Sequence, residues 1–303
     1  GLVFKEYINN YNIAIKELEK LVKNYFDQDG FPLTRNPSDL IFSSKYLILC
    51  KESIKDAQQY VPEFLETIID KNLICIKNIL TPNDQVPLFN GGTEEDLNQF
   101  NKFINDLDYK SKDKKNIIGG IQIFKFKNSS IFFDVGKPPD KGFSNSYQSG
   151  PLSFEYYLDG RKIITNCGFG SNISPKAELL SRLTSAQSTL TLNDNSVSKF
   201  ERNKLINKIF GNSIKNTFKI SDLNFEENID QIKSIASHNG YEKKFGCTYK
   251  RKISIDKPTN SLFGCDELIK KRDGKPINYS FRFHLYPGLT AIKTMGGNSV
   301  LIQ

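Results

Sequence analysis

The chain has 303 residues, of which 38% are hydrophobic and 25% charged, a composition typical of a globular protein with enough apolar surface for true cores. This length favours two domains over one. The sequence contains no run of roughly 18 apolar residues, so it predicts no membrane span. Its five cysteines include no Cys-x-x-Cys pair, which argues against a disulfide framework and a zinc knuckle.

The net charge of +8 is unevenly distributed. Residues 1–115 carry 15 Lys and Arg against 18 Asp and Glu, whereas residues 116–303 carry 27 against 16. The basic part could attract a polyanion such as a uronic-acid polysaccharide or a nucleic acid. A Lys-, Asn- and Ile-rich composition that reflects codon usage explains the excess equally well. No nucleic-acid-binding module is recognisable, so we expect no nucleic-acid partner.

The first third of the chain predicts helices. Apolar residues recur at helical spacing between Tyr7 and Val22, and Asp29-Gly30 breaks the pattern. The four expected helices run from residue 7 to before this breaker, from 38 to about 57, from 62 to about 80 and from 94 to about 107. Ser38 is the expected N-cap of the second helix. Helices of this length joined by short loops are typical of a helical-hairpin array or toroid.

The rest of the chain predicts strands. The hydrophobic period changes near residue 116 from the helical to the strand value, and we place a domain boundary there, in the charged segment 110–115. Apolar and polar residues alternate from Leu152 to Leu158, and Asp159-Gly160 predicts a hairpin turn. Alternation recurs near residues 190, 253 and 279–285. The predicted fold is α+β and multidomain, with a helical domain at 1–115 and an antiparallel β-sandwich at 116–303.

Six short motifs in a fixed order resemble those of a known family. They are DGFPLTRNP (29–37), LFNGGTE (88–94), YQSGPLSF (147–154), AQSTLTL (186–192), SHNGY (237–241) and RFHLYP (282–287). Together they resemble the heparinase II/III-like polysaccharide lyases. The resemblance covers nearly the whole chain and implies a partial α/α toroid followed by a β-sandwich, with substrate bound in the cleft between them.

The resemblance also implies the chemistry of that cleft. Uronic-acid lyases remove the proton next to a carboxylate and expel the glycosidic oxygen. An amide, Arg or His that binds the carboxylate makes this proton acidic, and a Tyr or His acts as base and acid. Some members hold a zinc ion in the sandwich with two His and an acid.

Carried onto this chain, the family's histidine and metal positions fall on other residues. The sandwich metal positions become Gln148, Asn166 and Gln187, whose carboxamides are poor zinc ligands, so we expect neither a metal nor a cofactor. The histidine of the helical loop falls on Pro32. The residues expected to bind substrate are Arg35, Asn36, Asn90, Gln148, Gln187, Arg282 and His284. Arg35 could equally serve as an ion-pair or capping residue, and Asn90 as a turn residue with positive φ.

Few groups remain for proton transfer. His238 and His284 are the two histidines of the chain. His238 is the better catalytic candidate because Tyr241, close in sequence, could complete an acid/base pair. Tyr147 is another candidate base. The alternative is that both histidines are hydrogen-bonded structural residues and that Tyr147 is an edge-strand aromatic.

Two functions of different class remain. The Gly-rich segment 167–170 leads into no helical pattern, which argues against dinucleotide and P-loop sites. The first function is a carbon–oxygen lyase that cleaves an acidic polysaccharide by β-elimination. The second is a non-catalytic carbohydrate-binding relative in envelope polysaccharide handling. The family resemblance places either in the cell envelope or periplasm. Because the chain starts without Met and stops after a strand-like pattern, we expect both termini, including the end of the sandwich, to be truncated.

Overall fold

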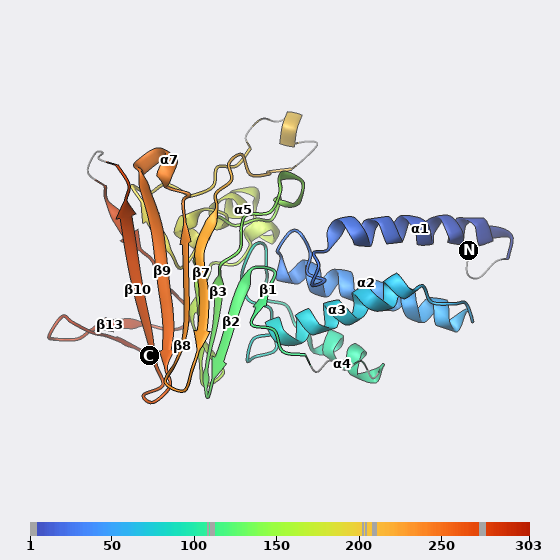
Figure 1. Cartoon of the computed structure of the whole chain (residues 1–303), viewed down its shortest axis with the longest axis horizontal. Coiled ribbons are helices and arrows are strands. Elements are labelled where there is room, and N and C mark those ends of the chain that lie inside the picture. The colour runs from blue at the N-terminus through green and yellow to red at the C-terminus, as the bar shows by residue number, and fades with distance from the viewer. Residues whose placement is uncertain are drawn as a thin grey trace.

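The computed structural model describes residues 5–303 except 108, 110–112, 202, 204, 208–210 and 273–276. Figure 1 shows a bundle of helices at one side of two stacked β-sheets. The segment 110–115, where the sequence predicts the domain boundary, lies partly outside the described residues. None of the described helices is long and apolar enough to cross a membrane.

Four helices form the first part of the chain. They are α1 (Ile8–Tyr25), α2 (Pro37–Asp56), α3 (Glu63–Ile79) and α4 (Asn98–Asp106). The apolar stripe of α1 packs on α2 and α3 around Ile48, Leu65 and Ile69. The N-cap of α2 is Asn36 rather than Ser38, because the Asn36 side-chain oxygen accepts a 2.9 Å hydrogen bond from the Ser38 backbone N–H.

The second part is an antiparallel sandwich. Its six-stranded sheet contains β1 (Ile117–Ile118), β2 (Ile121–Phe126), β3 (Ser129–Asp134), β4 (Phe154–Leu158), β5 (Arg161–Thr165) and β12 (His284–Leu285), in that order. Its four-stranded sheet contains β10 (Ser261–Lys270), β9 (Cys247–Asp256), β8 (Gln231–His238) and β7 (Ile220–Glu227), in that order. The α+β class and the antiparallel sandwich are therefore confirmed.

Smaller elements connect the strands. Two short ladders pair β6 (Leu190–Leu192) with β11 (Tyr279–Phe281) and β13 (Ala291–Lys293) with β14 (Val300–Ile302). The short helical elements are η1 (Lys5–Tyr7), η2 (Lys141–Phe143), η3 (Gly170–Asn172), α5 (Pro175–Ser181), η4 (Thr184–Ala186) and α7 (Glu242–Phe245).

The six-stranded sheet lies between two cores. Phe133 and Phe154 face the four-stranded sheet and pack in one cluster with Tyr249 and Ile253. Phe132, on the opposite face of β3, joins a cluster that includes Ile76 of α3. In Figure 1 this sheet is accordingly the layer between the helices and the outer sheet.

Residues 279–285 correct one sequence interpretation. Tyr279, Phe281 and Phe283 alternate with Ser280 and Arg282 there, a pattern that predicts a single strand with one apolar face. The structure divides the segment into β11, which pairs with β6, and β12, which pairs with β5. Tyr279 and Phe283 are 63% and 51% exposed, so the aromatic face does not enter the core.

Candidate functional site at the helix–sandwich junction

Arg35 holds the helical part onto the sandwich. Its guanidinium forms an ion pair with the buried carboxylate of Asp134 at the end of β3. It also donates from Nε to the Gly119 carbonyl at 2.8 Å and from Nη1 to the Lys137 carbonyl at 3.2 Å. The Arg35 side chain is 9% exposed. The geometry therefore supports the ion-pair alternative and contradicts the expected role in substrate binding.

Asn36 and Asn90 shape the backbone beside Arg35. Asn36 caps α2, and its amide nitrogen donates to Asp39 at 3.2 Å. Asn90 has a φ of 53° and donates to the Arg35 carbonyl at 3.4 Å, which is the behaviour of a turn residue. Both side chains are buried. The expectation that these amides bind substrate is therefore not supported, because their polar atoms already serve the fold.

Gln148 and Gln187 form a closed network of amides. The Gln148 side chain accepts from the Gly91 N–H at 3.1 Å and donates to the Ser181 carbonyl at 2.9 Å. Gln187 donates to the same carbonyl at 2.8 Å. Both side chains are 1% exposed. The two glutamines stand at positions where the family resemblance implied metal ligands, and both amide nitrogens there donate to one carbonyl. Among the described residues no group of three or more His, Cys, Asp or Glu could hold a metal ion.

His238 and Tyr241 lie in the sandwich core, not in a cleft. They are 1% and 2% exposed, and the His238 ring packs 5.6 Å from the Tyr241 ring and 5.4 Å from the Tyr249 ring. Burial lowers the pKa of His238 to about 3 and raises the pKa of Tyr241. The Tyr241 hydroxyl donates to the Leu190 carbonyl at 2.9 Å. This burial contradicts the predicted proton transfer by the pair, because a polysaccharide cannot reach either ring.

Tyr147 and Arg282 also serve the sandwich. Tyr147 is fully buried in its core, and burial raises the pKa of its hydroxyl, which contradicts a role as base. Arg282 donates to the Thr191 hydroxyl and lies 3.3 Å from the Asp194 carboxylate. Neither residue lines the groove described next.

A groove of about 500 Å³ lies between the loop that follows α3 and the end of β5. It is lined by Leu88, Thr93, Glu94, Thr165, Asn166, Cys167, Gly168, Phe169, His284, Leu285, Tyr286 and Pro287. A larger hollow of about 720 Å³ lies between α1 and α3 and is lined only by residues of the helical part. The smaller groove is the better candidate because it lies at the junction and is lined by His284, a predicted site residue that is only partly buried.

His284 is held as a neutral base. Its Nε2 lies 3.0 Å from the Ser185 carbonyl. Since a carbonyl oxygen only accepts, Nε2 carries the hydrogen and Nδ1 keeps its lone pair. Burial lowers the pKa of His284 below its usual value. Tyr286 follows two residues later, just past the end of β12, and its N–H donates to the Ile163 carbonyl at 3.1 Å. Both His284 and Tyr286 line the groove.

Asn166 places an unused donor in the groove. Pairing of His284 with Thr165 sets the adjoining Asn166 beside this strand. The Asn166 side-chain oxygen accepts from the Ser188 N–H at 2.9 Å, which fixes the orientation of the amide. Asn166 is 1% exposed, like His238, but it borders the groove, and no described atom accepts a hydrogen bond from its buried amide nitrogen. An unsatisfied buried donor is costly, and a ligand oxygen in the groove would remove that cost.

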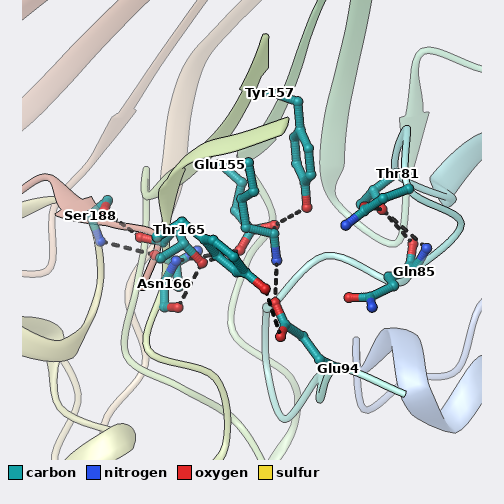
Figure 2. Close-up of polar contacts among 11 residues, drawn as sticks. Thr81, Gln85, Glu94, Glu155, Tyr157, Thr165, Asn166 and Ser188 are labelled. Atoms are coloured by element: carbon teal, nitrogen blue, oxygen red, sulfur yellow. Dashed lines mark hydrogen bonds and ion pairs between the residues drawn. The ribbon is translucent and has the colours of Figure 1, made fainter. Parts of the chain in front are cut away.

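A buried charged network supports this part of the groove. Figure 2 shows Glu155 receiving hydrogen bonds from Tyr157 and from Thr165, each at 3.1 Å. Burial raises the pKa of Glu155. Lys162, whose side chain is 1% exposed, lies 3.8 Å from Glu155 and 3.1 Å from Glu94 of the helical part. The network therefore ties the loop of Glu94 to strands β4 and β5.

Sequence reasoning missed Glu94, Glu155, Lys162 and Tyr286 as site residues. Glu155 alternates with apolar neighbours, a pattern that predicts an exposed face, yet it is fully buried because the helical part covers that face. Tyr286 lies in the RFHLYP motif beside His284. Its spacing of two residues from His284 was the available signal that the two share one face.

Comparison with known proteins shows the family to which this chain belongs. The described residues form helical hairpins joined to an antiparallel sandwich, with a groove at their junction. The family model "Heparinase II/III-like, C-terminal" matches residues 115–303. The chain therefore belongs to the heparinase II/III-like family. Among curated protein sequences, none matches this chain.

Solved structures share the fold. A heparan sulfate lyase from Pedobacter heparinus superposes with a TM-score of 0.72 at 16% identity, over 98% of this chain and 47% of that one. A heparinase III superposes with a TM-score of 0.72 at 16% identity, over 98% of this chain and 49% of that one. A second heparinase III superposes with a TM-score of 0.70 at 15% identity, over 96% and 46%. The chain thus spans about half the length of these structures, and at this identity the likeness shows the fold alone.

Proposed function

We propose that this protein binds a uronic-acid polysaccharide in the junction groove and cleaves it by β-elimination. The observation that carries the proposal is the pairing of a free amide donor, Asn166, with a neutral imidazole, His284, in one groove. Membership of the heparinase II/III-like family supports the choice of a polysaccharide as the ligand.

The proposed roles follow from the chemistry of each group. The Asn166 amide nitrogen donates to the uronate carboxylate, which stabilises the negative charge that develops as the adjacent proton leaves. His284 Nδ1 takes that proton, and the electron pair of the broken carbon–hydrogen bond forms the new carbon–carbon double bond. The bond to the glycosidic oxygen breaks, and the leaving oxygen takes a proton from the Tyr286 hydroxyl. His284 then returns its proton through solvent, and Tyr286 is protonated again.

The test is a cleavage assay with matched variants. The protein is incubated with alginate, pectate and heparin-type glycans, and the absorbance of the unsaturated uronate is followed. We expect His284→Gln to lower kcat by about 10²- to 10⁴-fold, the usual contribution of a general base, with binding retained. Asn166→Asp keeps the acceptor for Ser188 but places a carboxylate against the substrate carboxylate, so we expect a loss of at least about 10²-fold in kcat/KM.

The buried pair provides the control. Tyr241→Phe removes one hydroxyl from the sandwich core, and His238→Gln removes the other histidine; with the fold verified by thermal melting, both should cleave at the parental rate. If His238→Gln or Tyr241→Phe abolishes cleavage in a folded protein while His284→Gln does not, the proposed assignment is wrong. Absence of both cleavage and binding for every acidic glycan would refute the function itself.

A second candidate is a non-catalytic carbohydrate-binding protein that acts in envelope polysaccharide handling. The observation that favours it is the closed network of Gln148 and Gln187, which occupies positions where the family resemblance implied histidines. Binding of a uronate glycan without formation of an unsaturated product would select this candidate. For either function we propose a location in the cell envelope or periplasm, which fractionation of the source cells would test.

A further inference from the structure

The groove carries no positive side chain of its own. None of the described residues that line it is Lys or Arg, and Glu94 is its one carboxylate. The nearest cation in the network, Lys162, has a side chain that is 1% exposed and is engaged by Glu94 and Glu155. Figure 2 shows the labelled Glu94 and Glu155 close together in this network. Among the described residues that line the groove, Glu94 is therefore the one charged group.

The two carboxylate oxygens of Glu94 contact different residues. One carboxylate oxygen lies 3.1 Å from Lys162, and the other accepts from the Tyr286 hydroxyl at 3.3 Å. Its side chain remains 35% exposed. A carboxylate in this position can accept hydrogen bonds from sugar hydroxyls, and it repels any anionic group brought beside it.

Part of the positive charge of the sandwich lies on its outer sheet. Lys233 of β8 pairs with Glu226, and Lys250 of β9 lies 3.9 Å from Glu267. Both lysines are on the four-stranded sheet, which Figure 1 shows as the layer away from the helices. The excess of Lys and Arg in residues 116–303 therefore supplies no cation to the lining of the groove.

Sulfate and carboxylate make different demands on such a groove. A sulfate ester stays fully ionised, and proteins usually hold such anions with Arg or Lys in bidentate or point-charge contacts. An anion moved out of water without a cation loses hydration that neutral donors only partly replace. A single uronate carboxylate can accept a hydrogen bond from the free Asn166 amide. Additional sulfate groups would find no further free donor among the described lining residues and would be repelled by the Glu94 carboxylate.

We propose that the groove selects uronate-containing glycans that carry no sulfate and that Glu94 is the residue that rejects sulfated chains. This inference rests on the polysaccharide binding proposed above and narrows it to one substrate class. A glycan without sulfate also differs from heparan sulfate, the substrate named for the lyase whose fold this chain shares. Binding in the groove should depend weakly on salt, because salt screens exposed charge pairs and the groove offers no cation to an anionic ligand.

The test compares two glycans with the same kind of backbone. Binding of unsulfated heparosan and of heparin fragments of equal length is measured by calorimetry at low and at physiological salt. We expect heparosan to bind at least about tenfold more tightly than heparin to the parent protein. Glu94→Gln should narrow this difference by about fivefold or more, because it removes the repelling charge and frees Lys162.

Glu95→Gln is the matched control. Glu95 lies next to Glu94 in the same loop and accepts from Thr93 at 2.8 Å, but it does not line the groove. It should leave the preference for heparosan unchanged. Equal or tighter binding of heparin by the parent, or an equal effect of the two substitutions, would overturn the selectivity while leaving polysaccharide binding intact. Binding of neither glycan, nor of alginate or pectate, would overturn the proposed function as well.

Discussion

Removal of Arg35 should destabilise the protein strongly. The ion pair with Asp134 is almost fully buried, with side chains that are 9% and 1% exposed. Breaking a buried pair by removing one partner typically costs about 3–5 kcal/mol, because the remaining charge is left without compensation. In Arg35→Met the Asp134 carboxylate keeps the Gly136 N–H at 3.1 Å but loses its cation. We therefore expect a loss of about 3–4 kcal/mol in the free energy of unfolding.

A double-mutant cycle measures whether the pair acts as a unit. Arg35→Met, Asp134→Asn and the double variant are unfolded in urea, followed by circular dichroism. The double variant should be less destabilised than the sum of the single variants by about 1–3 kcal/mol, because neither charge is then left alone. Lys20→Met is the control, since the pair of Lys20 with Glu17 is exposed and should contribute at most about 1 kcal/mol.

The result also decides between two roles for Arg35. If Arg35 bound the substrate carboxylate, Arg35→Met would keep its stability and lose glycan affinity. A change in unfolding free energy below about 1 kcal/mol, or strict additivity in the cycle, would refute the structural role argued here.

The helices were predictable because their signals are local. A stripe of apolar residues at helical spacing and a Pro at the start of α2 are present in the sequence itself. The beginning of α4 was predicted at Glu94 but lies at Asn98. Glu94 bonds to Lys162 and Tyr286, both distant in the chain, and local propensity contains no information on such partners.

The strands were predictable where one face of the sheet is exposed. β3 is buried on both faces, since helices cover one side and the second sheet covers the other. Its sequence therefore shows no alternation. For the same reason Glu155 looked like a surface residue, although it is a buried member of the network beneath the groove.

The direction of His238 was harder to predict. Along β8 the buried positions include Ile232, Ser234, Ala236 and His238. Alternate residues of a strand share a face, so His238 lies on the inward face. Serine and alanine make that face too weakly apolar to recognise in the sequence, and the apolar Ile235 lies on the other face. The position of His238 in the SHNGY motif favoured a place in a cleft. The register of β8 instead puts the imidazole ring in the core.

Two further predictions concern the buried positions of the sandwich. The purified protein should contain no stoichiometric zinc by elemental analysis, because the Gln148 and Gln187 amides donate to the Ser181 carbonyl; about one zinc per chain, lost on mutating either glutamine, would contradict this. His238 should make stability fall in acid. Burial holds its folded pKa at about 3, below the unfolded value of about 6.5. The unfolded state therefore binds more protons in acid. The contribution of His238 to the free energy of unfolding is complete above pH 6.5 and is lost as the pH falls toward 3. At pH 5 this lowers the free energy of unfolding by about 2 kcal/mol. His238→Gln cannot titrate, so the parent should lose about 2 kcal/mol more than this variant between pH 7 and pH 5 in urea unfolding. Equal losses in the two proteins would show that the imidazole is not held neutral by the core.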